Sequence, residues 1–130
     1  MFLFAGLGNQ AYASFHLWTI NEVFSNGDGT IQYIELTTTF SGQGVLSGHS
    51  LVSTDGGTNQ NVFNFEDDLA GDTQNQTLLI ATTQFATETG LTPDFTIPEQ
   101  FIFTSGGELN FAEDADNISF TREQLPLNDM

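Results

Sequence analysis

The sequence predicts an all-β protein, a β-sandwich or barrel of about eight or nine short strands with at most one short helical turn. Two β-type runs flank the hairpin signal Asn26-Gly27-Asp28-Gly29, turn residues recur between further short apolar runs, and no stretch keeps a helical period. With 130 residues, 38% of them hydrophobic, the chain is long enough for one core. We therefore expect a single domain.

The first segment resembles an export signal. Residues 1–7 are apolar, and Ala11-Tyr12-Ala13 has the small-x-small form of a signal-peptidase site before Ser14. No basic residue precedes the apolar run, so residues 1–13 are interpreted as a truncated signal peptide, with a buried first strand as the alternative. Residues 14–130 then form the domain. Whether it lacks its last strand stays open, because residues 125–130 stop where a closing strand is expected.

The predicted hairpin brings two glutamates to one face of a sheet. Trp, Ile, Val, Phe and Tyr on both sides of the turn suit a pleated, half-buried surface. Pairing the strands about the turn makes Glu22 and Glu35 diagonal neighbours. The expected pairs are Phe24 with Ile31, Glu22 with Tyr33, and Ile20 with Glu35.

The middle of the chain alternates short strands with turns. The expected elements are a loop at 37–44, a short strand pair or bent strand at 45–53, an alternating strand at 61–65 and a central strand at 77–82. Residues 83–90 suit one or two helical turns, with Thr83 as the cap and Gly90 as the stop.

The last third closes the series of strands. Pro93 and Pro98 predict an extended edge segment between them. A strand is expected at 101–104, ending at Gly106-Gly107, and two more at 109–111 and 118–120, around an acidic turn.

Three segments together resemble the opening half of the lamin tail domain family, whose pattern is I-N-E-V, I-E-L and L-S-G-W-x-L. They are Ile20-Asn21-Glu22-Val23, Tyr33-Ile34-Glu35-Leu36 and Leu46-Ser47-Gly48-His49-Ser50-Leu51. The match covers about residues 15–53, and His49 stands where the family usually has Trp. The resemblance implies an immunoglobulin-like antiparallel β-sandwich.

The resemblance also implies a function without catalysis. Lamin tail domains of bacteria occur mainly in exported or cell-surface proteins, so we expect a non-catalytic interaction or spacer module that is secreted, periplasmic or on the cell surface. The family offers no catalytic residues. The positions that match its motif are carried over as a structural framework only: Asn21, Glu22, Glu35 and Gly48.

The net charge of the chain restricts the classes of partner that it is expected to bind. Seventeen acidic residues against one basic residue, Arg122, give a net charge of -16, which repels nucleic-acid phosphates and anionic lipids. No stretch approaches the roughly 20 apolar residues of a membrane span, so no membrane insertion is expected. The absence of cysteine excludes disulfides and thiol nucleophiles. An unidentified protein or carbohydrate surface is the expected partner.

Acidic loops make calcium the one candidate cofactor. Closely spaced loop carboxylates supply the oxygen ligands that calcium prefers, although such loops are commonly solvated turns. A calcium-dependent carbohydrate-binding or adhesion module is the alternative function. The candidate ligands are Glu66, Asp67, Asp68 and Asp72, or Glu113, Asp114 and Asp116.

A small hydrolase is the third hypothesis. Two neighbouring carboxylates, Glu22 and Glu35, could act as an acid and base pair, provided that a concave pocket surrounds them. The structural alternative is that each accepts hydrogen bonds from a loop that crosses the sheet. Gly48-His49-Ser50-Leu51-Val52 lacks the final glycine of a nucleophile elbow, so the sequence predicts no enzyme.

Overall fold

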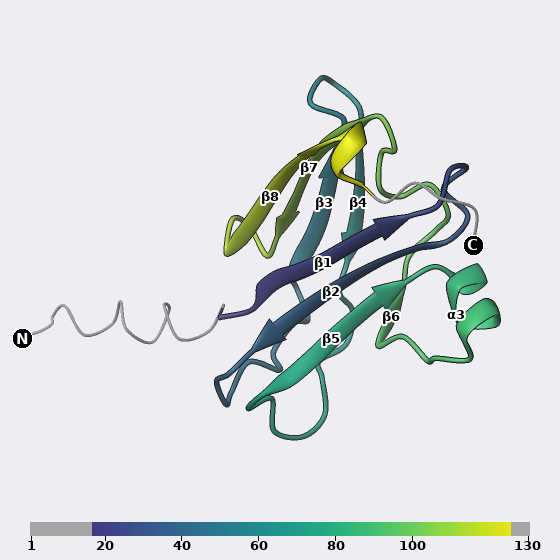
Figure 1. Ribbon diagram of the computed structural model, residues 1–130. Helices are drawn as coiled ribbons and strands as arrows, with labels where there is room; N and C mark the ends of the chain where they lie inside the picture. The colour runs from purple at the N-terminus through teal and green to yellow at the C-terminus, as the bar shows by residue number, and fades with distance from the viewer. Residues whose placement is uncertain (1–16, 126–130) are drawn as a thin grey trace, which may run out of the picture.

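Two packed β-sheets make up the computed structural model, which describes residues 17–125 (Figure 1). The first sheet has the order β1-β2-β5-β6 and the second the order β4-β3-β7-β8. The described part of the chain thus holds eight strands, one short helix and one 3-10 turn. The predicted all-β, immunoglobulin-like sandwich is confirmed.

The elements are short, as the frequent turn residues indicate. The strands are β1 (Thr19–Ser25), β2 (Gln32–Thr38), β3 (Ser50–Thr54), β4 (Gln60–Asn64), β5 (Gln76–Ala81), β6 (Phe95–Thr96), β7 (Gly106–Phe111) and β8 (Asp116–Thr121). The helical segments are α3 (Thr83–Thr89) and the 3-10 turn η1 (Arg122–Gln124).

One strand pair departs from the predicted antiparallel pattern. The edge strand β6 pairs with β5 in parallel, through Ile80 with Phe95 and Ala81 with Thr96. The chain leaves β5 through α3 and then runs beside it in the same direction, which a tight hairpin cannot achieve. The other pairs in the described part are antiparallel.

The core lies between the two sheets and follows from strand alternation. In β2, Ile34 and Leu36 are fully buried, whereas Tyr33, Glu35 and Thr37 point to the outer face and are half-buried. Side chains from both sheets and from the connecting loops join the core, among them Trp18, Leu51, Phe65, Leu78, Ile80, Phe101, Leu109 and Phe111.

The predicted register of the first hairpin was wrong by two residues. The observed partners are Phe24 with Tyr33 and Glu22 with Glu35. The turn is longer than predicted, because Asn26 and Ile31 close it: the Asn26 N–H donates to the Ile31 carbonyl, and the Asn26 side-chain oxygen accepts from the Ile31 N–H. A shift of two residues keeps each side chain on its predicted face.

The strand expected at residues 101–104 is a buried loop instead. Ile102 is 1% exposed, but its N–H and carbonyl bond the side-chain amide of Gln32, at 2.9 Å each. The buried amide thus takes the place of a neighbouring strand.

The next strand, β7, begins at Gly106-Gly107, where the sequence predicted an end. A Cβ on Gly107 would lie 1.9 Å from the carbonyl oxygen of Thr54. Glycine is therefore the residue that lets β7 approach the end of β3 so closely.

Two further elements have boundaries that differ slightly from the predicted ones. The helix predicted at 83–90 is α3, and its cap is Thr82 rather than Thr83, while Gly90 ends it with a φ of 76°. The segment predicted at 45–53 is a strand only from Ser50.

The predicted signal peptide, residues 1–13, lies outside the described residues. Among residues 17–125, no helix is long and apolar enough to span a membrane.

Candidate functional site

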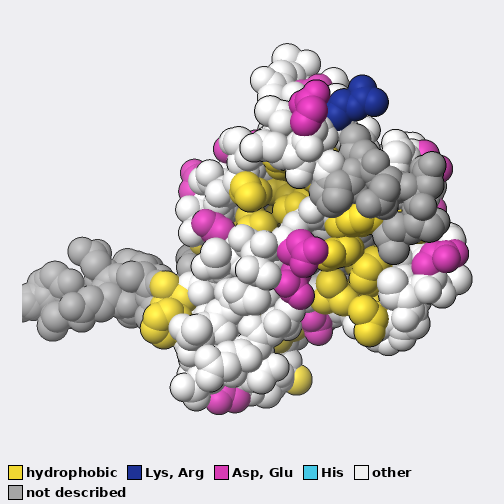
Figure 2. All heavy atoms as spheres, viewed as in Figure 1, with side chains coloured by type: hydrophobic (Ala, Val, Ile, Leu, Met, Phe, Trp, Pro, Cys, Tyr) yellow, Lys and Arg dark blue, Asp and Glu magenta, His cyan; other side chains and the backbone are white. Residues whose placement is uncertain are grey.

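A pocket of about 390 Å³ lies on the outer face of the first sheet, beside α3. Figure 2 shows apolar side chains gathered between β1 and α3, with acidic side chains directly beside them. We name this cavity the α3 pocket. Its lining residues are Glu22, Tyr33, Glu35, Thr77, Leu79, Phe85, Thr89 and Leu91.

Two aromatic residues, Tyr33 and Phe85, line the α3 pocket, and a third ring, Phe24, packs against Tyr33. Phe24 and Tyr33 are opposite each other in the hairpin, and their rings stack with centroids 5.4 Å apart. On the other neighbouring strand, Tyr33 faces the small residue Ala81, which leaves room for Phe85 of α3. Phe85 packs against Tyr33 at 5.0 Å. Tyr33 is therefore held between two rings.

Thr82 fixes α3 over this wall. Its buried hydroxyl accepts from the N–H of Phe85, at 3.3 Å, and so caps the helix. The same hydroxyl donates to the carbonyl of Thr30 and accepts from the N–H of Gln32. One side chain thus joins the start of the helix to the start of β2, and the position of Phe85 follows from it.

Glu22 and Glu35 stand directly opposite each other on adjacent strands. Like charges in this position repel each other, so each carboxylate needs a donor. The Tyr33 hydroxyl donates to Glu22 at 2.5 Å, and the Asn21 amide donates to Glu35 at 2.8 Å. Both partners belong to the same hairpin, and not to a loop that crosses the sheet. The structure thus brings the two predicted carboxylates together.

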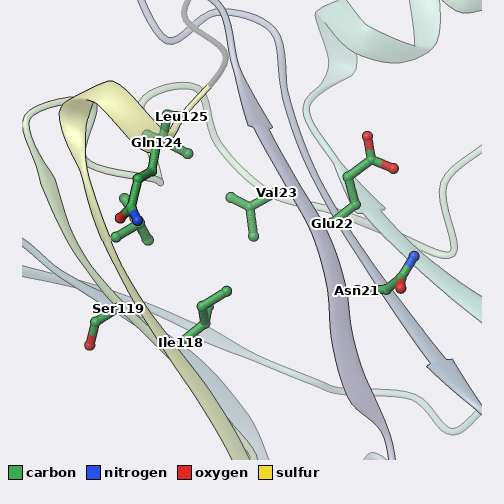
Figure 3. Close-up of a pocket in the computed structure, with 8 residues that line it drawn as sticks. Asn21, Glu22, Val23, Ile118, Ser119, Gln124 and Leu125 are labelled. Carbon is green, nitrogen blue, oxygen red and sulfur yellow. The ribbon is translucent and has the colours of Figure 1, made fainter.

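A β-bulge explains how Asn21 reaches Glu35. The register of the hairpin shifts between Ile20 and Glu22, which leaves Asn21 as the extra residue. A bulge re-aims its side chains, and Figure 3 shows Asn21 and Glu22 on the same side of β1. The framework residue Asn21 therefore serves the carboxylate pair.

The surroundings of Tyr33 keep its hydroxyl protonated. Burial raises the pKa of Tyr33, and so do the hydrogen bond to Glu22 and the negative charges of Glu22 and Glu35, to about 12 from the ordinary 10.0. Tyr33 is consequently a hydrogen-bond donor throughout the physiological pH range.

A second, smaller hollow of about 210 Å³ separates the edge strands β1 and β8. Val23 projects into it from β1 and Ile118 from β8, with Leu125 at one end (Figure 3). Glu22 points to the opposite side of β1, toward β2. Glu22 lines this hollow as well as the α3 pocket, and polar and apolar residues contribute equally to the lining of the hollow.

Comparisons with family models, with curated proteins and with solved structures find no match to this chain. The resemblance to the lamin tail domain thus rests on the residues of its motif, and the structure shows the local contacts that several of them make.

Gly48 and His49 belong to a turn that the second sheet anchors. The His49 N–H donates to the Leu46 carbonyl, and Gly48, with a φ of 90°, takes the turn position that favours glycine. The His49 ring lies 2.7 Å from a carboxylate oxygen of Glu113, whose other oxygen accepts from the N–H and hydroxyl of Ser50. His49 thus ties this turn to the turn between β7 and β8.

These contacts lower the pKa of the Glu113 carboxyl group. Partial burial acts to raise its pKa, but the hydrogen bonds from His49 and Ser50, together with the charge of His49, outweigh burial and hold the pKa below its ordinary value. The carboxylate remains ionised in this turn at neutral pH.

The candidate calcium ligands mostly bond the protein itself. Asp68 accepts from the N–H of Ser47, Asp72 from that of Gln74, and Asp116 from that of Ile20. Asp114 exchanges hydrogen bonds with Asn110. Within residues 17–125, no three acidic or histidine side chains converge as a metal site requires. Calcium binding remains a hypothesis.

Sequence reasoning missed most of the α3 pocket. Its apolar members come from β5 and from the segment around α3, far along the chain from the hairpin. Alternation placed Tyr33 on the same face as Glu35, which is the one signal that points toward the site. Nothing in the local pattern of residues 83–91 indicates which face of the sheet the helix covers.

Proposed function

We propose that this chain is a non-catalytic interaction module of the lamin tail type, which acts outside the cell or at its surface and binds a positively charged partner. The observation that carries the proposal is the α3 pocket, in which Glu22 and Glu35 stand beside apolar walls. An apolar cavity with a few convergent polar groups is the usual form of a binding site. Here the convergent groups are both anionic.

The net negative charge of the whole molecule also favours a positively charged partner. The chain carries -16, and its one basic residue, Arg122, lies in η1, which does not line the α3 pocket. Figure 2 shows this basic side chain well away from the apolar side chains near α3. A field of one sign speeds the approach of an oppositely charged partner and repels anions.

A small hydrolase is the second candidate, and the pocket around Glu22 and Glu35 is the observation that favours it. Acid–base hydrolysis by two carboxyl groups uses one protonated and one ionised group. In this site the Glu22 carboxylate accepts a hydrogen bond from Tyr33, and the Glu35 carboxylate accepts one from Asn21. Two adjacent carboxylates beside apolar walls equally suit the binding of a cation, which is the function proposed first.

The test is the binding of a short, labelled poly-L-lysine to the full chain, measured by fluorescence anisotropy at physiological ionic strength. We expect saturable binding that weakens as salt is added. The double variant Glu22→Gln/Glu35→Gln is expected to bind at least about tenfold more weakly, the equivalent of about 1.4 kcal/mol.

The matched control is Glu99→Gln/Glu108→Gln, which also removes two negative charges. Neither residue lines the α3 pocket, and Glu108 lies on β7 in the second sheet. We expect this control to lose less than about threefold in affinity, through the weaker general field alone. Equal losses in both double variants, or no binding of poly-L-lysine at all, would contradict the proposed function.

A further inference from the structure

We propose that the α3 pocket seats a lysine side chain of the partner polypeptide, with the ammonium group at Glu22 and Glu35 and the methylene stem along Leu79 and Leu91. This inference rests on the proposed function and names the group that the pocket recognises.

The charged end of the pocket has room for an ammonium group. One oxygen of Glu22 accepts from Tyr33 and one oxygen of Glu35 accepts from Asn21. The second oxygen of each carboxylate accepts no hydrogen bond from residues 17–125. An ammonium group carries three donors and no acceptor, so it can bond both remaining oxygens, and the Thr77 hydroxyl lies in the same lining.

The apolar end fits an aliphatic stem. Leu79, Phe85 and Leu91 line it, and Leu91 is 55% exposed. The position of Leu91 is set by hydrogen bonds: its N–H donates to the Thr89 hydroxyl, which donates to the Phe85 carbonyl. Lysine characteristically lays its methylenes along apolar surface and keeps its charged end among polar groups.

The aromatic wall argues against a quaternary ammonium group. Such cations have no hydrogen to donate and bind to the faces of aromatic rings. Phe24 stacks on Tyr33 and Phe85 packs against it, so the ring of Tyr33 is already occupied by other rings. The recognition that remains is by carboxylate oxygens, which requires N–H donors.

The carboxylates argue against a guanidinium group. Arginine binds best through a fork that engages both oxygens of one carboxylate. In Glu22 and in Glu35 one oxygen already accepts a bond from the hairpin itself, so a guanidinium fork would have to share that oxygen with the existing donor. A lysine needs only one oxygen from each, which is the arrangement present here.

The experiment is a titration of the full, isotope-labelled chain followed by two-dimensional NMR. The probes are N-acetyl-lysine-methylamide, its trimethyllysine, arginine and norleucine analogues, and butylamine as a free amine. We expect saturable shifts of amides in β2, β5 and α3 with the lysine probe. Its affinity is expected to exceed that of the three analogues by at least about fivefold, or about 1 kcal/mol.

Variants separate the two ends of the site. Glu22→Gln/Glu35→Gln should abolish saturable shifts, and Leu91→Ser should weaken the lysine probe about threefold through the loss of apolar contact. Leu91 is exposed, so this substitution does not threaten the core. Glu99→Gln/Glu108→Gln serves as the control and should behave like the natural chain.

The outcomes distinguish this inference from the proposed function. If poly-L-lysine binds through Glu22 and Glu35 but the trimethyllysine or arginine probe matches the lysine probe, the inference fails and the interaction module stands. Tighter binding of butylamine than of the lysine probe would also overturn it, in favour of a free amine. If neither poly-L-lysine nor the lysine probe binds, both fail.

Discussion

Tyr33 connects the polar and the apolar parts of the α3 pocket. Its ring lies between Phe24 and Phe85, and its hydroxyl donates to Glu22. The same residue therefore orients a carboxylate and holds α3 against the sheet through Phe85. A single half-buried side chain on the outer face of β2 thus contacts both the polar and the apolar part of the site.

We predict that Tyr33 ionises near pH 12, against 10.0 for an ordinary tyrosine. The absorbance of tyrosinate during an alkaline titration measures this, after subtraction of the Tyr33→Phe variant. Glu22→Gln removes a hydrogen-bonded anion and should lower the pKa toward 10.0, whereas Glu108→Gln should not. An unshifted Tyr33 in the natural chain would contradict the geometry.

The same shift sets a pH dependence of stability. Because the pKa in the folded state lies above that in the unfolded state, the contribution of Tyr33 is fully present below about pH 10. It is lost as the pH rises through about 12, since the unfolded chain then releases the proton more readily. Urea unfolding across this range should show a smaller decline for Tyr33→Phe than for the natural chain.

At the scale of elements, side chains rather than strands make several of the contacts that join segments. The Gln32 amide pairs with the backbone of Ile102, and Thr82 joins α3 to β2. In β7 the absence of a side chain is what matters, because Gly107 has no Cβ and the strand can therefore approach Thr54 closely.

We predict that Gly107→Ala prevents stable folding. The added Cβ would lie 1.9 Å from the Thr54 carbonyl oxygen, far inside van der Waals contact, so part of the second sheet must move. The expected loss in the free energy of unfolding exceeds about 4 kcal/mol. Urea denaturation followed by circular dichroism measures it.

Gly42→Ala is the matched control for Gly107→Ala. Gly42 also has a positive φ, of 78°, but its added Cβ would meet no atom within 4 Å. Its expected cost is the conformational term alone, about 1 to 2 kcal/mol. Similar losses in the two variants would show that backbone conformation, and not the close approach to Thr54, explains the glycine at position 107.

At the scale of the whole molecule, charge opposes compactness. With -16 on 130 residues, the acidic side chains repel one another across the surface. Hydrogen bonds from the backbone to surface carboxylates, such as Ser47 to Asp68 in a loop and Ile20 to Asp116 at the start of β8, offset part of this repulsion. The acidic loops therefore contribute to structure as well as to the field.

We predict that the melting temperature rises by several degrees when ionic strength increases from about 0.01 M to about 0.15 M, because the Debye length falls from about 30 Å to about 8 Å. Scanning calorimetry in sodium chloride measures this rise. A melting temperature that is independent of salt would contradict the repulsion.

The calcium hypothesis is tested in the same series. Calcium bound in an acidic loop would raise the melting temperature beyond sodium chloride or magnesium chloride at equal ionic strength. That additional rise should disappear in Asp67→Asn/Asp68→Asn or in Asp114→Asn/Asp116→Asn. Equal curves for calcium and magnesium would count against a calcium-dependent module.

Local patterns were sufficient for the fold class and for the approximate positions of most strands along the chain. The residues Thr83 and Gly90 marked the helix to within one residue, because α3 spans Thr83–Thr89 with Thr82 as its cap. The common face of Glu22 and Glu35 was also predicted from the sequence. This prediction holds although the predicted register was wrong, because a shift of two residues leaves each side chain on the same face of the strand.

Tertiary structure alone decided how these elements meet. Tyr33 and Phe85 are 52 positions apart, Gln32 and Ile102 are 70 apart, and the His49 ring meets a carboxylate 64 positions away. No local propensity encodes such pairs, because they form only when both sheets and the connecting loops close around one core. The sequence by itself thus determined the sandwich and the shared face of the two glutamates, whereas packing created the pocket around them.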